Sequence, residues 1–128
     1  MSTIDIFVKS YHRDFKLLKY SLETIKMNVL GYRNIVLLIP EQEKHLFDTR
    51  DLPERTLIHY VHEFGSGYLF QQLCKITAHN YSDADFIMFS DSDLMYDRPI
   101  DLQEFIKDGK PEILYTDWSK VGDAICWK

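Results

Sequence analysis

Two carboxylates one residue apart are the residues of this chain whose type and spacing most clearly indicate chemistry. Asp91 and Asp93 flank Ser92, and Ser90 separates them from the apolar run Phe-Ile-Met-Phe at positions 86–89. Carboxylate oxygens are hard ligands that suit Mg²⁺ or Mn²⁺, and such an ion can carry a phosphate group. The alternative is an ordinary polar turn, because Asp and Ser are common turn residues.

The apolar run before these carboxylates decides between the two interpretations. It is short, bounded by polar residues and rich in β-forming side chains, so it predicts a fully buried central strand. In open α/β sheets, ligands bind beyond the carboxyl ends of such strands. The position of Asp91 and Asp93 therefore favours a binding site over a plain turn.

The rest of the chain alternates between strand and helix patterns. Strands are predicted at 4–8, 34–39, 55–61 and 86–89, and helices at 15–28, in a short stretch after Pro40, and at 68–81. Asp14 is the predicted N-cap of the first helix. This alternation predicts an α/β fold with a mostly parallel sheet and helices on both of its faces.

The pattern weakens after Asp93. A short helix is predicted at 102–107 and a further strand at 113–115, and residues 116–128 have no clear period. The length of 128 residues predicts a single domain over 1–128.

Charge, hydropathy and cysteine spacing argue against several classes of function. Fifteen basic and twenty acidic residues give a net charge of −5, which disfavours a nucleic-acid partner. The sequence has neither an apolar stretch long enough for a transmembrane segment nor the start of a signal peptide, so we expect a cytoplasmic protein. Cys74 and Cys126 match no zinc or redox spacing, and Cys74 is predicted to be a small core residue.

Asp91-Ser92-Asp93 after the fourth predicted strand resembles the nucleotide-sugar-binding half of GT-A glycosyltransferases, particularly a bacterial and phage subset. The resemblance covers residues 3–103. It is supported by Ser10 and Tyr11 after the first strand and by the segment 65–75, which enters the helix before the motif. It implies a Rossmann-like sheet with strand order 3-2-1-4 and a crevice between the first and fourth strands.

The resemblance also implies roles for individual residues at the motif. Asp93 would coordinate Mn²⁺ or Mg²⁺. Asp91 would reach either the ribose hydroxyls or the metal through water, and Ser92 would lie beside the donor.

Residues before the motif would complete the donor site. Ser10, Tyr11 and Arg13 would line the nucleoside pocket, with Tyr11 stacking on the base, and Lys75 would approach the diphosphate or the sugar. Each has a plainer interpretation: Tyr11 as a half-buried loop aromatic, and Arg13 and Lys75 as solvated surface charges.

The implied function is a metal-dependent transfer of a sugar from a nucleoside diphosphate-sugar, with UDP favoured, to an unidentified glycan, lipid or protein acceptor. GT-A enzymes commonly continue into an acceptor-binding half that often supplies a late His ligand for the metal. Here all five histidines precede the motif and only 35 residues follow Asp93, so the acceptor half is expected to be short or missing. Asp117 and Asp123 are interpreted as surface carboxylates, and no catalytic base is assigned. Exposed aromatic side chains near Tyr115, Trp118 and Trp127 could pack on a partner or on a missing half, so a homo-oligomer is one open alternative.

Three other classes of protein compete with this hypothesis. The first is a nucleotide-sugar or metal-binding module without turnover. The second is a haloacid-dehalogenase-like phosphatase, but there the Asp-x-Asp normally closes the first strand and has Thr or Val at its fourth position, where this chain has Leu94. The third is a structural or interaction protein with an incidental acidic turn.

Overall fold

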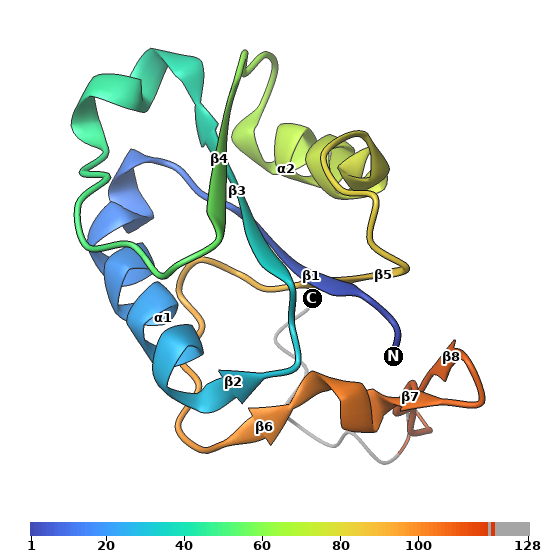
Figure 1. Ribbon diagram of the computed structural model, residues 1–128. Coiled ribbons are helices and arrows are strands. Elements are labelled where there is room, and N and C mark those ends of the chain that lie inside the picture. The colour runs from blue at the N-terminus through green and yellow to red at the C-terminus, as the bar shows by residue number, and fades with distance from the viewer. Residues whose placement is uncertain (118, 120–128) are drawn as a thin grey trace.

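Four parallel strands form the main sheet of the protein, whose computed structural model describes residues 1–117 and 119. They are β1 (Ile4–Lys9), β3 (Asn34–Pro40), β4 (Thr56–Val61) and β5 (Phe86–Phe89). Their order across the sheet is β4-β3-β1-β5, and every neighbouring pair is parallel (Figure 1). The predicted parallel α/β sheet and its four strands are therefore confirmed, with boundaries shifted by one residue at most.

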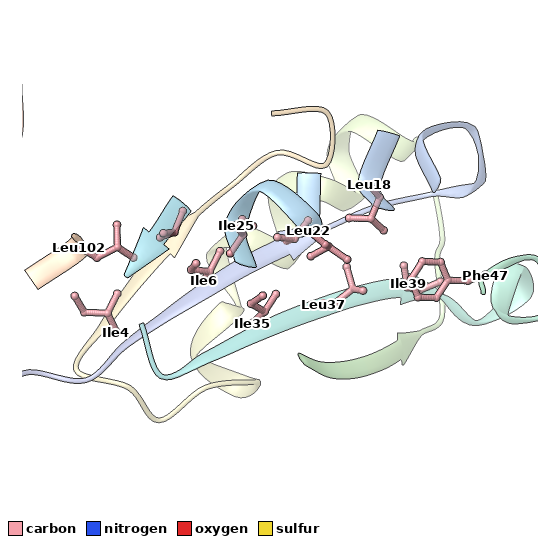
Figure 2. Close-up of a cluster of buried hydrophobic side chains, with 12 residues drawn as sticks. Ile4, Ile6, Leu18, Leu22, Ile25, Ile35, Leu37, Ile39, Phe47 and Leu102 are labelled. Atoms are coloured by element: carbon pink, nitrogen blue, oxygen red, sulfur yellow. The ribbon is translucent and has the colours of Figure 1, made fainter. Parts of the chain in front are cut away.

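Helix α1 (Phe15–Asn28) covers one face of this sheet. Its apolar residues Leu18, Leu22 and Ile25 recur at helical spacing and are buried against inward-facing strand residues. The strand side of this layer, drawn in Figure 2, comes from Ile4, Ile6, Val8, Ile35, Leu37 and Ile39. The helix predicted at 15–28 is confirmed.

Helix α2 (Gly67–Ile76) covers the opposite face, so the sheet has helices on both sides (Figure 1). Its buried residues Phe70 and Cys74 pack on Phe7, Val36 and Leu38, which alternate with the residues under α1. Cys74 is a buried free thiol, and burial raises its pKa. The prediction that Cys74 is a core residue is confirmed.

Two of the helices predicted before the Asp-Ser-Asp motif differ from the structure. The helix expected at 68–81 ends at Ile76, where the Thr77 hydroxyl donates to the Leu73 carbonyl at 2.8 Å. A separate 3₁₀ turn, η3 (Ala78–Asn80), follows. The helix after Pro40 is the 3₁₀ helix η2 (Glu41–Leu46), because so short a segment gains little from α-helical hydrogen bonds.

Strand β5 is not the fully buried central strand that its apolar run predicts. Among the described residues it pairs only with β1 and lies at the edge of the sheet, and Phe89 is 47% exposed. The central strands are β1 and β3, which are buried along nearly their whole length. A four-residue apolar run does not distinguish an edge strand from a central one, because at the edge Phe86 and Met88 still pack on the core under α1 and Ile87 on the core under α2.

Short elements follow the motif. Strand β6 (Ile100–Asp101) pairs in parallel with β2 (Val29–Leu30), outside the main sheet. The helix predicted at 102–107 is instead the 3₁₀ helix η4 (Leu102–Phe105), and β7 (Ile106–Lys107) then forms a hairpin with β8 (Lys110–Pro111).

The strand predicted at 113–115 is not formed. Ile113 to Tyr115 are 77–95% exposed and pair with no strand of the described residues. Cys126, Asp123, Trp118 and Trp127 lie outside the described residues. In the described part of the chain, no helix combines the length and apolar character that crossing a bilayer requires.

Candidate functional site

The carboxyl ends of β1 and β5 lie side by side, and this brings two predicted site loops together. Phe89 at the end of β5 is in register with Phe7 of β1, and the Ser90 amide donates to the Phe7 carbonyl at 3.0 Å. Ser10, which follows β1, donates its amide to Leu38 of β3 at 3.0 Å. The loop carrying Asp91 and Asp93 therefore starts next to the loop carrying Ser10 and Tyr11.

Hydrogen bonds within the turn and from helix α1 hold the turn that carries the two aspartates. The Leu94 amide donates to the Asp91 carbonyl at 3.2 Å, and the Ser21 hydroxyl of α1 donates to the Leu94 carbonyl at 2.6 Å. The Tyr96 and Ser90 hydroxyls are 2.9 Å apart. Burial raises the pKa of Tyr96, so its hydroxyl stays protonated and able to donate.

Ser92, the residue between the aspartates, points inward. It is 5% exposed, and its hydroxyl donates to a carboxylate oxygen of Asp14 at 3.0 Å. Asp14 occupies the N-cap position of α1, but its side chain makes no capping hydrogen bond. The predicted N-cap position is therefore confirmed, but the Asp14 carboxylate does not cap the helix. The 3₁₀ turn η1 (His12–Asp14) leads into α1, and the carboxylate anchors the motif.

Asp91 and Asp93 are both exposed on this turn, on either side of the buried Ser92. They open into a cleft of about 460 Å³ at the carboxyl edge of the sheet. The residues that line it come from four parts of the chain: Lys9, Ser10, Tyr11, Asp14, Glu63, Gly67, Tyr68, Gln71, Asp91, Ser92 and Asp93. Predicted site residues from both loops thus meet in one cavity.

Ser10 and Tyr11 form part of the cleft wall. Ser10 is 1% exposed, and its hydroxyl has no hydrogen-bond partner among the described residues. Tyr11 is 40% exposed. The next residue, His12, fixes this loop because its amide and its ring nitrogen Nδ1 each lie 2.6 Å from a carboxylate oxygen of Glu43.

Lys75 and Arg13 are placed differently. Lys75 lies beside the cleft and its ammonium group is 3.3 Å from a carboxylate oxygen of Asp91, so it joins the site through this ion pair. Arg13 is exposed and does not line the cleft. For Arg13, the geometry fits the plainer interpretation of a solvated charge.

Lys9 and Glu63 are site residues that sequence reasoning missed. Lys9 is the last residue of β1 and is 8% exposed. Its ammonium group donates to the Ser10 carbonyl at 2.8 Å, lies 3.6 Å from a Glu63 carboxylate oxygen and sits 5.5 Å from the centre of the Phe70 ring. The rule that pointed to Asp91 also applied to Lys9, because both lie where a strand reaches the crevice.

The carboxylates of Asp91 and Asp93 suit a hard divalent cation, but they do not form a complete cage. Among residues 1–117 and 119, no group of three or more His, Cys, Asp or Glu side chains could hold a metal ion. Mg²⁺ is commonly bound by one or two carboxylates together with substrate phosphates and water. The two aspartates therefore fit a metal that arrives with a phosphorylated ligand.

No protein-family model matches this chain, and no curated protein is similar enough in sequence to suggest a family or a function for it.

Proposed function

We propose that this chain is a GT-A-like, metal-dependent glycosyltransferase domain that takes a nucleoside diphosphate-sugar as donor, with UDP as the favoured nucleotide. One observation carries the proposal: Asp91 and Asp93 share a cleft with Ser10 and Tyr11 at the carboxyl ends of β5 and β1. Ligands of open α/β sheets bind at such a place.

The strand order gives further support. Counted along the chain without β2, which lies outside the main sheet, the four strands lie in the order 3-2-1-4. This is the order that the GT-A resemblance implies. The crevice then falls between β1 and β5, at the cleft that holds the two aspartates.

The chemistry of the proposed reaction explains why these residue types are needed. Sugar transfer breaks a bond to an anionic diphosphate leaving group, and a divalent cation bound there neutralises the developing charge. Asp91 and Asp93 would hold this cation. Ser10 would offer its unpartnered hydroxyl to the nucleoside and Tyr11 its aromatic ring, while Lys75 would supply positive charge to the diphosphate.

The proposal is tested by calorimetric titration of UDP into the protein with and without Mn²⁺. We expect binding that depends on Mn²⁺, is abolished by EDTA and is weakened at least tenfold by Asp93→Asn, since one of two metal ligands is lost. Asp97→Asn is the matched control, because Asp97 is exposed, does not line the cleft and, within residues 1–117 and 119, forms an ion pair only with Arg98. Binding that ignores both the metal and Asp93→Asn would contradict the proposal.

A second candidate function, donor binding without turnover, is favoured by the two-carboxylate site, in which no catalytic base is assigned. Product analysis separates the two. Purified protein incubated with UDP-sugars, Mn²⁺ and a panel of glycan, lipid and peptide acceptors should release UDP and form a glycosylated product. Metal-dependent UDP binding without any product or UDP release would favour the binding module.

A further inference from the structure

Lys9 lines the candidate cleft and Lys75 lies beside it, and the two lysines are held in very different ways. The Lys9 side chain is 6% exposed and has three partners: the Ser10 carbonyl, the Glu63 carboxylate and the Phe70 ring. The Lys75 side chain is 27% exposed, and its ammonium group contacts Asp91 alone among the described acidic residues. Lys9 is therefore fixed, whereas Lys75 is held by one partly exposed ion pair.

The backbone of Lys75 belongs to helix α2, which packs on the sheet. Tyr68 and Gln71 line the cleft, and Lys75 continues the same face of α2 one turn further on. Phe70 and Cys74 lie on a neighbouring face of this helix and are buried against the sheet. A rotation of the Lys75 side chain alone can thus move its charge along the cleft wall, with no change in the fold.

The partner of Lys75 is one of the two carboxylates placed to bind a divalent cation. An ammonium group and a divalent cation compete for the same carboxylate oxygen, because each is attracted to the same negative charge. Lysine carries three donors and no acceptor, so a displaced ammonium group needs another anion nearby. The diphosphate of the proposed donor would supply one.

We infer that Lys75 is the internal counter-ion of Asp91 and that a divalent cation displaces it. Lys75 is in this sense a positioning residue: it neutralises and holds Asp91 before the metal binds, and afterwards its charge is available to the diphosphate. The inference rests on the proposed function for the identity of the second anion. Displacement of Lys75 also explains why the metal should bind poorly without a nucleotide. A metal that binds alone must break the ion pair between Lys75 and Asp91 and gains no phosphate ligand in return.

The test is a Mn²⁺ titration without nucleotide, followed by electron paramagnetic resonance of the free ion. Lys75→Met removes the competing charge, and we expect Mn²⁺ to bind about twofold to fivefold more tightly, in the range typical of an exposed ion pair. Lys75→Arg keeps the charge and should bind Mn²⁺ as the wild type does. Lys107→Met is the control for charge, because Lys107 forms an ion pair of 2.7 Å with Glu112, away from the cleft.

A double-mutant cycle shows whether Lys75 acts through Asp91. The gain from Lys75→Met should vanish in an Asp91→Asn background. An equal gain in that background would overturn the inference, because the effect would then be a general one of charge. Unchanged or weaker Mn²⁺ binding in Lys75→Met, or no Mn²⁺ binding by any variant, would also overturn it.

The second half of the test uses UDP at saturating Mn²⁺. Here Lys75→Met should weaken UDP binding about tenfold, as expected for the loss of a hydrogen bond to a charged group. The two Lys75→Met effects thus have opposite signs, which a merely destabilised protein would not show. If Mn²⁺ behaves as expected but no variant binds a nucleoside diphosphate, the displacement of Lys75 is supported and the proposed function is contradicted.

Discussion

The residues of the Asp-Ser-Asp turn have divided roles. The two carboxylates face the cleft, whereas Ser92 is buried and bonded to Asp14 at 3.0 Å. This bond ties the loop after β5 to the start of α1, so the aspartates are placed by a hydrogen bond that crosses between two loops. The sequence shows the exposed pair through its spacing, but it does not show the partner of Ser92.

Ser92→Ala removes the hydrogen bond that anchors the turn. The Asp14 carboxylate loses a donor in a partly buried place, so we expect the free energy of unfolding to fall by about 1 kcal/mol. Urea unfolding measures this change. Asp14→Asn keeps an acceptor oxygen and should cost less than Ser92→Ala, and an unchanged midpoint for Ser92→Ala would show that the bond contributes nothing.

Asp5, a buried carboxylate in strand β1, makes the free energy of unfolding depend on pH. Burial alone would raise the pKa of Asp5, but hydrogen bonds from Arg33, Ser82 and the Asn34 amide outweigh it and hold this pKa below 3.8. Asp5 therefore binds fewer protons in the folded protein than in the unfolded chain. Its contribution to stability is present above about pH 4 and is lost as the pH falls through the folded-state pKa.

Asp5→Ala tests this dependence. Asp5 is the buried acceptor of hydrogen bonds from Arg33, Ser82 and the Asn34 amide, and Arg33 is partly exposed and keeps Asp83 as a partner. We therefore expect a loss of about 2 kcal/mol at neutral pH. In urea unfolding at a series of pH values, the free energy of unfolding of the variant should also fall less steeply with decreasing pH than that of the wild type. Asp97→Asn, at an exposed position, should show neither the large neutral-pH loss nor the same change in slope.

At the scale of elements, helix α1 and the strands follow from local patterns, but their positions in the sheet do not. The spacing of Leu18, Leu22 and Ile25 is enough to predict α1, because burial of one helix face shows directly in the sequence. The edge position of β5 depends on which strands pair, and a single apolar run does not contain that information. For the same reason, the apolar segment 113–115 was predicted as a strand but pairs with no strand in the described part of the chain.

The turn between β2 and β3 depends on a glycine. Gly31 has a φ of +81°, and a Cβ atom there would lie 2.4 Å from a carboxylate oxygen of Asp101. We expect Gly31→Ala to cost about 2 kcal/mol or more, from both backbone strain and this clash. Gly109→Ala is the matched control: Gly109 has a φ of +71°, but a Cβ there would meet nothing within 4 Å.

Comparing the two alanine variants by thermal or urea unfolding isolates the effect of the clash. Gly109→Ala should cost only about 1 kcal/mol, the strain of a left-handed backbone. Equal losses would show that Asp101 moves aside and that the contact with β6 is not important for stability.

At the scale of the whole molecule, four separate parts of the chain meet at one end of the sheet. The loop after β1, the loop after β4, one face of α2 and the turn after β5 all contribute to the cleft. Asp91, Ser92, Asp93, Ser10 and Tyr11 were predicted, because strand ends and a family resemblance pointed to them. Lys9 and Glu63 were missed, because their pairing exists only once β1 and β4 lie in the same sheet.

The most direct test of the central claim is a crystal structure of the protein with UDP and Mn²⁺, with anomalous scattering used to locate the manganese. We predict a manganese peak in contact with the carboxylates of Asp91 and Asp93, a diphosphate on the same ion, and the nucleoside beside Ser10 and Tyr11. Manganese bound elsewhere, or UDP held away from the ends of β1 and β5, would contradict the proposed donor site.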